Sequence, residues 1–361
     1  MTRGLPRRAG QNPACGHIGT LERLPKWLKL VPIVAQWIWL SLRYRSITLP
    51  STTNPFITTG GLVGEGKMEY LEIMGPCALG ATARTTSILA HRPTLTKDAA
   101  NAMAQHGLSY PVVVKPDLGW CGFGVRKIDR ACDLHAYLAA FPAGERVVIQ
   151  EWIDQPGEAG IFYMRRADQK AGALIGMLLR EFPRVTGDGV HTVGELIAAD
   201  ERGRRLGQDG KSESCADLFC VPAIGEVVRI ANVGSTRVGG VYKDGSDFIT
   251  PALTAAIDAV ACDMKEFHAG RFDVKFSSLE SLQSGRFTIL EVNGAGSEAV
   301  HAWDPSFTLA RALRIIFDKQ RQLFALGAEM RLRGHPPVGC MELLRHHMRQ
   351  QKLINRYPPS N

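Results

Sequence analysis

Short apolar runs separated by polar turns mark the middle of the chain as a sheet with helices packed on it. Apolar residues cluster at 112–114, 124–128 and 146–153, and a glycine-rich loop separates the first two runs. Between the second and third runs, residues 129–141 are typical of a helix. We therefore predict the order strand, loop, strand, helix, strand for this region.

The second half of the chain continues with helices and a further pair of strands. Thr192 and Glu195 form the pattern of a helix capping box. Pro251 and Gly270 bracket a long amphipathic helix. Two strands, 271–277 and 286–292, follow with a polar loop between them, and a long helix over roughly 306–326 closes the domain. Together these elements predict a mixed α/β (α+β) fold.

Near the N-terminus, an uncharged stretch at 30–42 contains Trp37 and Trp39 and has cations on both sides. The stretch is too short to span a bilayer comfortably, and no small-x-small signal cleavage site follows it. Two interpretations remain open. Residues 26–45 form either an interfacial helix that makes a peripheral contact with an anionic membrane, or a helix packed on the protein body.

Composition and charge narrow the class of protein. The chain has 361 residues, of which 45% are hydrophobic, which is enough for two lobes. Residues 1–50 hold eight Lys/Arg and one acid, and residues 331–361 hold six and one, so the net charge of +8 leaves about −4 for residues 51–330. A nucleic-acid partner is therefore poorly supported. The eight cysteines show no CxxC motif, which favours a reducing cytoplasm.

The late strands carry the clearest candidate chemistry. Strand alternation places Arg271, Asp273 and Lys275 on one face, and it gives Glu291 and Asn293 a common face on the next strand. If the two strands pair, two carboxylates and one amide oxygen converge, a donor set that suits Mg²⁺. The competing interpretation is the exposed polar face of an edge hairpin.

A glycine-rich loop supplies the second candidate. The strand 112–114 leads into Lys115, and Gly119, Gly122 and Gly124 follow within a few residues. Backbone N–H groups of such a loop can surround phosphate oxygens. Neither the P-loop nor the Rossmann fingerprint applies, because a strand follows the loop and the Gly-Lys-Ser/Thr ending is missing. An ordinary hairpin turn is the alternative.

Taken in order, these motifs resemble the ATP-grasp superfamily. The resemblance rests on a strand ending in Lys-Pro at 115–116, the glycine-rich loop, VVIQEWI at 147–153, RFDV at 271–274 and ILEVNGAGSEA at 289–299. Within the superfamily, these motifs are similar to those of D-alanine-D-alanine ligases. The segment VTGDGVHTVGELI at 185–197 resembles the linker of cyanophycin synthetases. The resemblance covers roughly residues 60–325 and implies an ATP-grasp fold, in which two α+β lobes clasp a nucleotide.

Carried over residue by residue, the resemblance implies a complete site. For the nucleotide it implies phosphate contacts from Lys67 and Lys115, a lid of Gly119, Gly122 and Gly124, an adenine hinge of Gln150, Glu151, Trp152 and Ile153, and a ribose contact from Glu158. For the chemistry it implies the metal ligands Asp273, Glu291 and Asn293, with Arg271 steadying the acyl-phosphate. The implied cofactors are ATP and Mg²⁺, or Mn²⁺ in its place.

The implied activity is carboxylate–amine ligation through an acyl-phosphate, with a small-molecule acid and amine as partners. A non-catalytic ATP-binding regulatory or scaffold protein at the membrane surface is the alternative, and the complete metal set argues against it. A third possibility is phosphoryl transfer without ligation, as in ATP-grasp kinases and dikinases, but the sequence shows no phosphohistidine-type partner domain. After Asn293 the chain departs from the Thr-Ser/Pro-Gly turn of the D-alanine ligases, so Ser297, Glu298 and His301 either meet a different substrate or cap the next helix.

The expected domain organisation follows from these assignments. Residues 1–50 form the basic and apolar N-terminal segment, and 51–108 a reduced region before the ATP-grasp core. Residues 109–160 form the small lobe and 161–327 the large lobe with the metal site. Residues 328–361 form a basic C-terminal tail.

Overall fold

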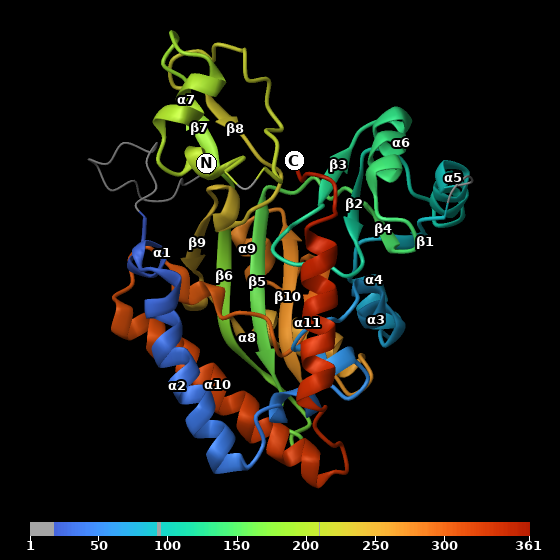
Figure 1. Cartoon of the computed structure of the whole chain (residues 1–361), viewed down its shortest axis with the longest axis vertical. Coiled ribbons are helices and arrows are strands. Elements are labelled where there is room, and N and C mark those ends of the chain that lie inside the picture. The colour runs from blue at the N-terminus through green and yellow to red at the C-terminus, as the bar shows by residue number, and fades with distance from the viewer. Residues whose placement is uncertain (1–17, 92–94, 209) are drawn as a thin grey trace.

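The computed structural model describes residues 18–91, 95–208 and 210–361, and these residues form two sheet-based lobes (Figure 1). The small lobe has a four-stranded antiparallel sheet in the order β1-β4-β2-β3. Its elements are β1 (Thr85–Leu89), α5 (Leu95–Gln105), β2 (Val112–Pro116), β3 (Arg126–Ile128), α6 (Ala131–Ala140) and β4 (Arg146–Glu151). The predicted strand and helix order over this region is confirmed.

The large lobe has a five-stranded antiparallel sheet in the order β11-β10-β5-β6-β9. Its elements are β5 (Gly157–Met164), β6 (Ala173–Glu181), β9 (Val241–Asp244), α8 (Pro251–Cys262), β10 (Ala269–Phe276), α9 (Leu279–Gln283) and β11 (Thr288–Asn293). Phe272 and Val274 are fully buried in the core that includes Leu253 and Ile257 of α8. The alternating charged side chains of β10 therefore face the opposite side of the sheet, toward the small lobe.

A small third unit projects beside the large sheet (Figure 1). It consists of β7 (Arg184–Thr186), β8 (Val227–Arg229) and α7 (Val193–Ala199). The Thr192 side chain accepts from the Glu195 N–H at 3.2 Å, and the Glu195 carboxylate accepts from the Thr192 N–H at 2.8 Å. The predicted capping box is confirmed.

Helices and short turns connect and flank the lobes. They are α1 (Thr20–Arg23), α2 (Lys26–Tyr44), η1 (Leu49–Thr52), η2 (Thr58–Gly61), α3 (Lys67–Glu72), α4 (Pro76–Gly80), η3 (Gly203–Arg205), η4 (Thr236–Val238), η5 (Ser246–Phe248), η6 (Val300–Trp303), α10 (Leu309–Leu332) and α11 (Cys340–Ile354). Figure 1 shows α2 and α10 side by side below the large sheet, and α11 in front of that sheet, next to the small lobe. Among the described residues, no helix combines the length and the apolar character needed to cross a bilayer.

The mixed α/β class and the two-lobed arrangement are confirmed, but other sequence-based expectations differ from the structure, including the helix from Pro251, which ends at Cys262 and leaves Gly270 in β10. The small lobe begins at β1 and not at residue 109, because β1 pairs with β4. Residues 328–361 are not a tail, because α10 extends to Leu332 and α11 adds Leu353 and Ile354 to the core of the small lobe. The connection between β10 and β11 contains the helix α9 where a polar loop was expected.

Candidate active site

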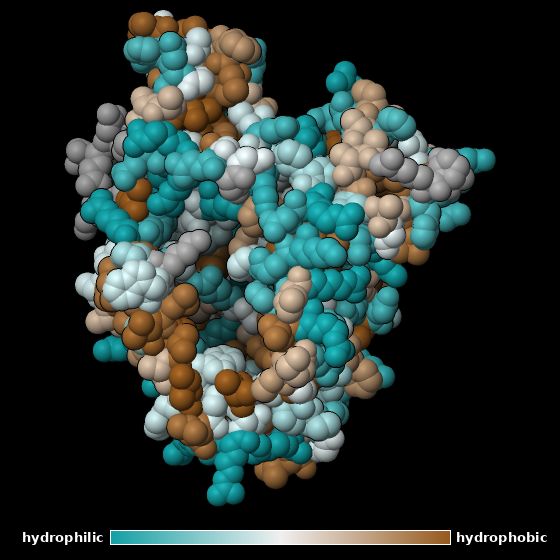
Figure 2. All heavy atoms as spheres, in the orientation of Figure 1, coloured by the Kyte–Doolittle hydropathy of each residue, from teal (hydrophilic) through white to brown (hydrophobic). Residues whose placement is uncertain are grey.

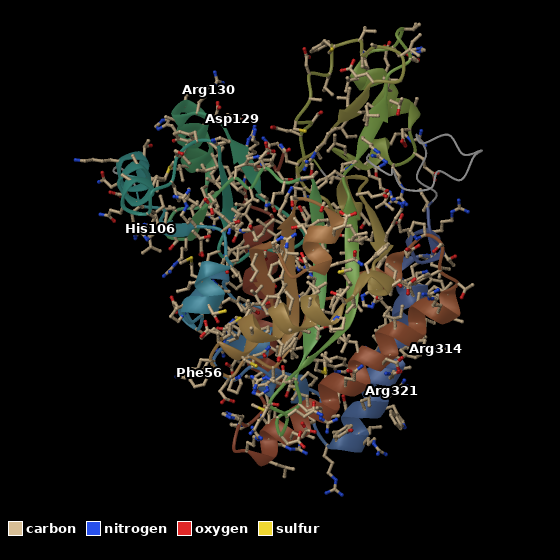
Figure 3. All side chains as sticks on the ribbon, turned by 180° about the vertical axis from the view of Figure 1, so that it is seen from behind. Phe56, His106, Asp129, Arg130, Arg314 and Arg321 are labelled. Atoms are coloured by element: carbon tan, nitrogen blue, oxygen red, sulfur yellow. The ribbon has the colours of Figure 1, made fainter. Side chains whose placement is uncertain are left out.

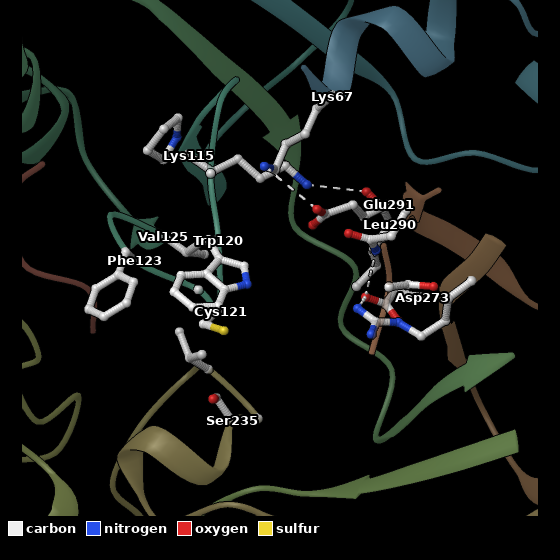
Figure 4. A pocket seen from close by; sticks show the side chains of 18 of the residues that line it. Lys67, Lys115, Trp120, Cys121, Phe123, Val125, Ser235, Asp273, Leu290 and Glu291 are labelled. Carbon is white, nitrogen blue, oxygen red and sulfur yellow. Dashed lines mark hydrogen bonds and ion pairs between the residues drawn. The ribbon is translucent and has the colours of Figure 1, made fainter. Parts of the chain in front are cut away.

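A cleft of about 500 Å³ lies between the lobes and collects the residues that the sequence singles out. The surface is hollowed in front of the large sheet (Figure 2), and Figure 4 shows side chains that line the cleft. Of the expected site residues, those that line it are Lys67, Lys115, Gly119, Gly122, Gln150, Glu151, Trp152, Ile153, Glu158, Arg271, Asp273, Glu291 and Asn293. Gly124 is the exception.

The oxygen donors lie on two paired strands, as the alternation predicts. Asp273 on β10 stands opposite Glu291 on β11, and Arg271 stands opposite Asn293. The Asn293 side-chain amide donates to the Asp273 carboxylate at 3.3 Å. The interpretation as an exposed edge hairpin does not fit, because Asp273 is only 5% exposed and β10 pairs with β5 along its other edge.

Two arginines hold the Asp273 carboxylate. Arg271 donates to both of its oxygens, at 2.7 and 2.8 Å, and Arg180 of β6 donates to one of them at 3.0 Å. Burial alone would raise the pKa of Asp273, but the charges of Arg180 and Arg271 outweigh burial and lower it. Asp273 is therefore ionised at neutral pH, as a metal ligand must be.

Glu158 also lines the cleft, is buried and has two cationic neighbours. It accepts from Arg180 at 2.9 Å, and its other oxygen is 3.9 Å from the Lys275 ammonium. Burial lowers the pKa of Lys275, with Glu158 opposing that effect. Because Arg180 also donates to Asp273, Glu158 and Asp273 belong to one buried charge network.

The two lysines reach the donor strands from different elements, Lys67 from α3 and Lys115 from β2 (Figure 4). The Lys115 ammonium donates to the Gln150 side chain at 3.0 Å and to the Leu290 carbonyl at 3.2 Å. Burial lowers the pKa of Lys115 to about 8, while Glu291 acts in the opposite direction. The Lys67 ammonium lies 3.6 Å from a Glu291 oxygen. The β2 lysine, the α3 lysine and the metal-ligand candidates thus share one space.

The glycine loop lines the cleft next to Lys67. A Cβ at Gly119 would lie 2.8 Å from the Lys67 nitrogen, and Gly122 has a φ of +75°. Gly124 does not line the cleft. It has a φ of +72°, its carbonyl accepts from the Tyr137 hydroxyl at 2.8 Å, and a Cβ there would meet the Pro116 ring. Gly124 therefore shapes the base of the loop.

The hinge 150–153 is held by its side chains. The Gln150 amide donates to the Thr85 hydroxyl at 2.9 Å and to the Leu290 carbonyl at 3.0 Å, which ties β4 to β11. The Glu151 carboxylate is engaged by Arg84 at 2.8 Å. Gln150 and Glu151 also belong to β4, which pairs with β1 and β2 on its two sides, and the Glu151 N–H donates to the Arg84 carbonyl at 3.0 Å. The adenine contact through the hinge backbone therefore stays a prediction.

Sequence reasoning missed several residues of the cleft. They are Glu65, Arg180, His347, Gln350, Gln351 and Asn361. Burial raises the pKa of Glu65 to about 7. Arg180 ends an apolar run in β6, where the lone cation was a usable signal, but α11 reaches the cleft only through the tertiary packing of a segment interpreted as a tail.

The far end of the cleft is built from the segment that departs from the D-alanine ligases. Ser297 and Glu298 line it, and the half-buried Lys319 donates to the Ser297 carbonyl and hydroxyl. Burial raises the pKa of Glu298 and lowers that of Lys319 to about 7. His301 instead packs on Phe162, with ring centroids 4.7 Å apart, and burial lowers its pKa to about 4, so it is a neutral packing residue.

The chemistry of Asp273, Glu291 and Asn293 suits one kind of metal ion better than others. Within the described part of the chain, no group of three or more His, Cys, Asp or Glu side chains is placed to hold one. The Asp273, Glu291 and Asn293 set offers two carboxylates and an amide, which fits Mg²⁺ completed by phosphate and water but not an all-protein cage. A half-turn of the Asn293 amide would point its oxygen toward the same place.

No protein family model and no curated protein matches this chain. Among solved structures, it is similar to a bifunctional glutathione synthetase from Pasteurella multocida, at 17% identity and a TM-score of 0.35 over 70% of this chain and 37% of that chain. It is also similar to the VanG D-Ala:D-Ser ligase from Enterococcus faecalis, at 15% identity and a TM-score of 0.41 over 74% of this chain and 63% of that chain. This chain thus spans less than two thirds of either protein. Likeness at this level leaves the cleft residues as the ground for a functional assignment.

Proposed function

We propose that this chain is an ATP- and Mg²⁺-dependent carboxylate–amine ligase of the ATP-grasp type. The observation that carries the proposal is the meeting, in one cleft, of two lysines and a glycine loop with the donors Asp273, Glu291 and Asn293. These are the residues whose order along the chain resembles the superfamily. Separate lobes supply them, which is the arrangement needed to enclose a triphosphate.

Each wall of the cleft has a task in this proposal. Lys115, Lys67 and the loop amides would bind phosphate oxygens, and the hinge 150–153 would bind adenine through its backbone. Asp273, Glu291 and Asn293 would hold Mg²⁺, which when bound neutralises charge on the terminal phosphates. Lowering of the Asp273 pKa supports this assignment, because the carboxylate is charged before the metal arrives.

Ligation requires stabilisation of an oxyanion and exclusion of water. Arg271 lies beside the donor set and would neutralise the negative charge that develops on the acyl oxygen. Phosphorylation of the substrate carboxylate would yield an acyl-phosphate, and attack by the amine would release phosphate. The glycine loop would shield this intermediate from hydrolysis. Ser297 and Glu298, which line the same cleft, would meet the amine or the acid.

The test is trapping of the intermediate with hydroxylamine. With ATP, Mg²⁺ and a panel of carboxylic acids, we expect a hydroxamate and phosphate from at least one acid. Glu291→Gln removes a metal ligand and should lower phosphate release at least about hundredfold. ADP binding without product across the panel would instead favour the non-catalytic alternative.

Glu280→Gln is a matched control, because Glu280 is exposed on α9 in the connection between the same two strands. It should retain the activity of the unmodified chain. Circular dichroism of both variants checks that each is folded. Full phosphate release by a folded Glu291→Gln variant would refute the metal assignment.

A further inference from the structure

Helix α2 exposes a continuous apolar surface, which we name the outer stripe. Its eight side chains are between 42% and 74% exposed, and Figure 2 shows hydrophobic residues along this edge of the molecule. The outer stripe consists of Trp27, Leu28, Leu30, Val31, Val34, Ile38, Trp39 and Leu42. At 100° per residue these positions fall on one side of the helix. A contiguous apolar surface of this kind marks a place of interaction.

The opposite side of α2 is firmly packed, so the outer stripe is not left bare by a loosely attached helix. Leu40 is 2% exposed and belongs to one core cluster with Phe324 of α10. The Gln36 amide donates to the Phe317 carbonyl at 2.8 Å, and the Gln320 amide donates to the Ile33 carbonyl at 3.3 Å. Contacts with α10 therefore fix the orientation of α2, and the outer stripe faces away from the rest of the protein.

Cations border the outer stripe, and α2 itself contains no Asp or Glu. Arg43 is exposed beside Trp39, with its guanidinium 5.8 Å from the Trp39 ring, and the exposed Arg45 follows at the end of the helix. On the neighbouring α10, Arg314 and Arg321 are exposed two turns apart (Figure 3). Of these, Arg321 pairs with Asp318. The border carries net positive charge.

We propose that the outer stripe of α2 docks on an anionic membrane surface, with the helix lying in the interfacial plane. The outer stripe is roughly 23 Å long at 1.5 Å per residue, and tryptophan lies near each end of it. Apolar side chains would enter the acyl boundary while the arginines meet lipid phosphates. A groove on a protein partner could also receive an apolar helix, but the arginines at its border and the absence of Asp and Glu from α2 favour an anionic surface.

Docking would bring the substrate end of the cleft toward the bilayer. The Lys29 ammonium lies 4.3 Å from the centre of the Trp303 ring, and the Trp303 indole N–H donates to the Glu298 carboxylate at 3.0 Å. Glu298 lines the cleft. Two residues, Trp303 and Glu298, therefore connect Lys29 of α2 to the cleft.

The test is flotation of the full chain with vesicles of phosphatidylcholine alone and of equal parts phosphatidylcholine and phosphatidylglycerol. We expect recovery with the anionic vesicles, weakened by salt. Val31→Gln with Ile38→Gln removes two outward side chains that are 60% and 50% exposed. Because glutamine keeps helix propensity, this double variant should remain folded and should partition at least about tenfold less.

A matched control removes two exposed apolar side chains from the projecting unit. Phe219→Gln with Ile224→Gln changes residues that are 89% and 83% exposed and should leave flotation unchanged. Equal flotation of the unmodified chain and the Val31 and Ile38 double variant would overturn the proposal. Sedimentation of both proteins provides a second test. A dimer of the unmodified chain that the double variant does not form, together with no recovery with vesicles, would also overturn the proposal.

Discussion

At the residue scale, charged side chains of the cleft form one connected network. Asp273 is shared by Arg180 and Arg271, and Glu158 is shared by Arg180 and Lys275. Burial lowers the pKa of Arg180, but Asp273 and Glu158 more than compensate and raise it. For Asp273, the neighbouring arginines keep the buried carboxylate ionised. Binding of a cation and a triphosphate would redistribute these contacts without placing an unpaired charge in the interior.

The pKa of Lys115 leads to a prediction about pH. The ammonium is charged below about pH 8 and loses its charge above it. Since a phosphate needs the charged form, the dissociation constant of ATP should rise above that pH, by up to about tenfold per unit. Titration calorimetry between about pH 7 and about pH 9 measures this.

Lys115→Arg is the matched variant, because a guanidinium stays charged throughout the range. Its ATP affinity should vary less with pH than that of the unmodified chain. Identical pH profiles for the two proteins would show that Lys115 is not the titrating phosphate contact.

At the element scale, α11 and the residues after it position the glycine loop. The Gln350 amide donates to the Gly119 carbonyl at 3.0 Å, and the Tyr357 hydroxyl donates to the Leu118 carbonyl at 2.7 Å. Arg237 at η4 also donates to the carbonyls of Cys121 and Gly122, at 3.3 and 3.4 Å. The loop is therefore tied to two distant segments in this conformation.

Tyr357→Phe tests this tie. The ring stacks on Phe141 with centroids 5.4 Å apart, and phenylalanine retains that contact while losing the hydrogen bond. We expect the free energy of unfolding to fall by about 1 kcal/mol. The KM for ATP should rise by roughly fivefold, since about 1 kcal/mol of loop positioning is lost. A fall in stability with an unchanged KM would mean that the tie is only structural.

Helix α2 offers a paired test of its two sides. Leu40 is 2% exposed and Leu42 is 74% exposed on the same helix. Leu40→Ala should lower the free energy of unfolding by about 2–5 kcal/mol, because it opens a cavity against Phe324. Leu42→Ala should change it by less than about 0.5 kcal/mol. Urea unfolding of both variants provides the comparison, and equal losses would contradict the packing described here.

At the scale of the whole molecule, both lobes line the cleft, so its ligand should stabilise both. A non-hydrolysable ATP analogue with Mg²⁺ at a hundred times its dissociation constant should add about 2.7 kcal/mol to the free energy of unfolding. Removing the metal with a chelator should weaken the effect. In Glu291→Gln the chelator should make little difference. Thermal unfolding measures all four conditions, and equal chelator sensitivity of the two proteins would contradict the metal site.

The sequence by itself determined the parts that follow from local pattern. Alternation placed Arg271 and Asp273 on one face of β10, because successive side chains of a strand point to opposite sides. Apolar runs located the strands around the glycine loop, and Thr192 with Glu195 located the start of α7. These features depend on neighbours along the chain, so the order of residues is sufficient to predict them.

Tertiary structure decided what depends on distant partners. Only the folded chain brings Arg180 to Asp273, α11 to the glycine loop, and β1 into the small-lobe sheet. It also showed that one side of α2 packs on α10 while the other is exposed, where the sequence left packing and membrane contact as alternatives. Such contacts join residues far apart along the chain, and their free energy arises only when burial and charge pairing form together.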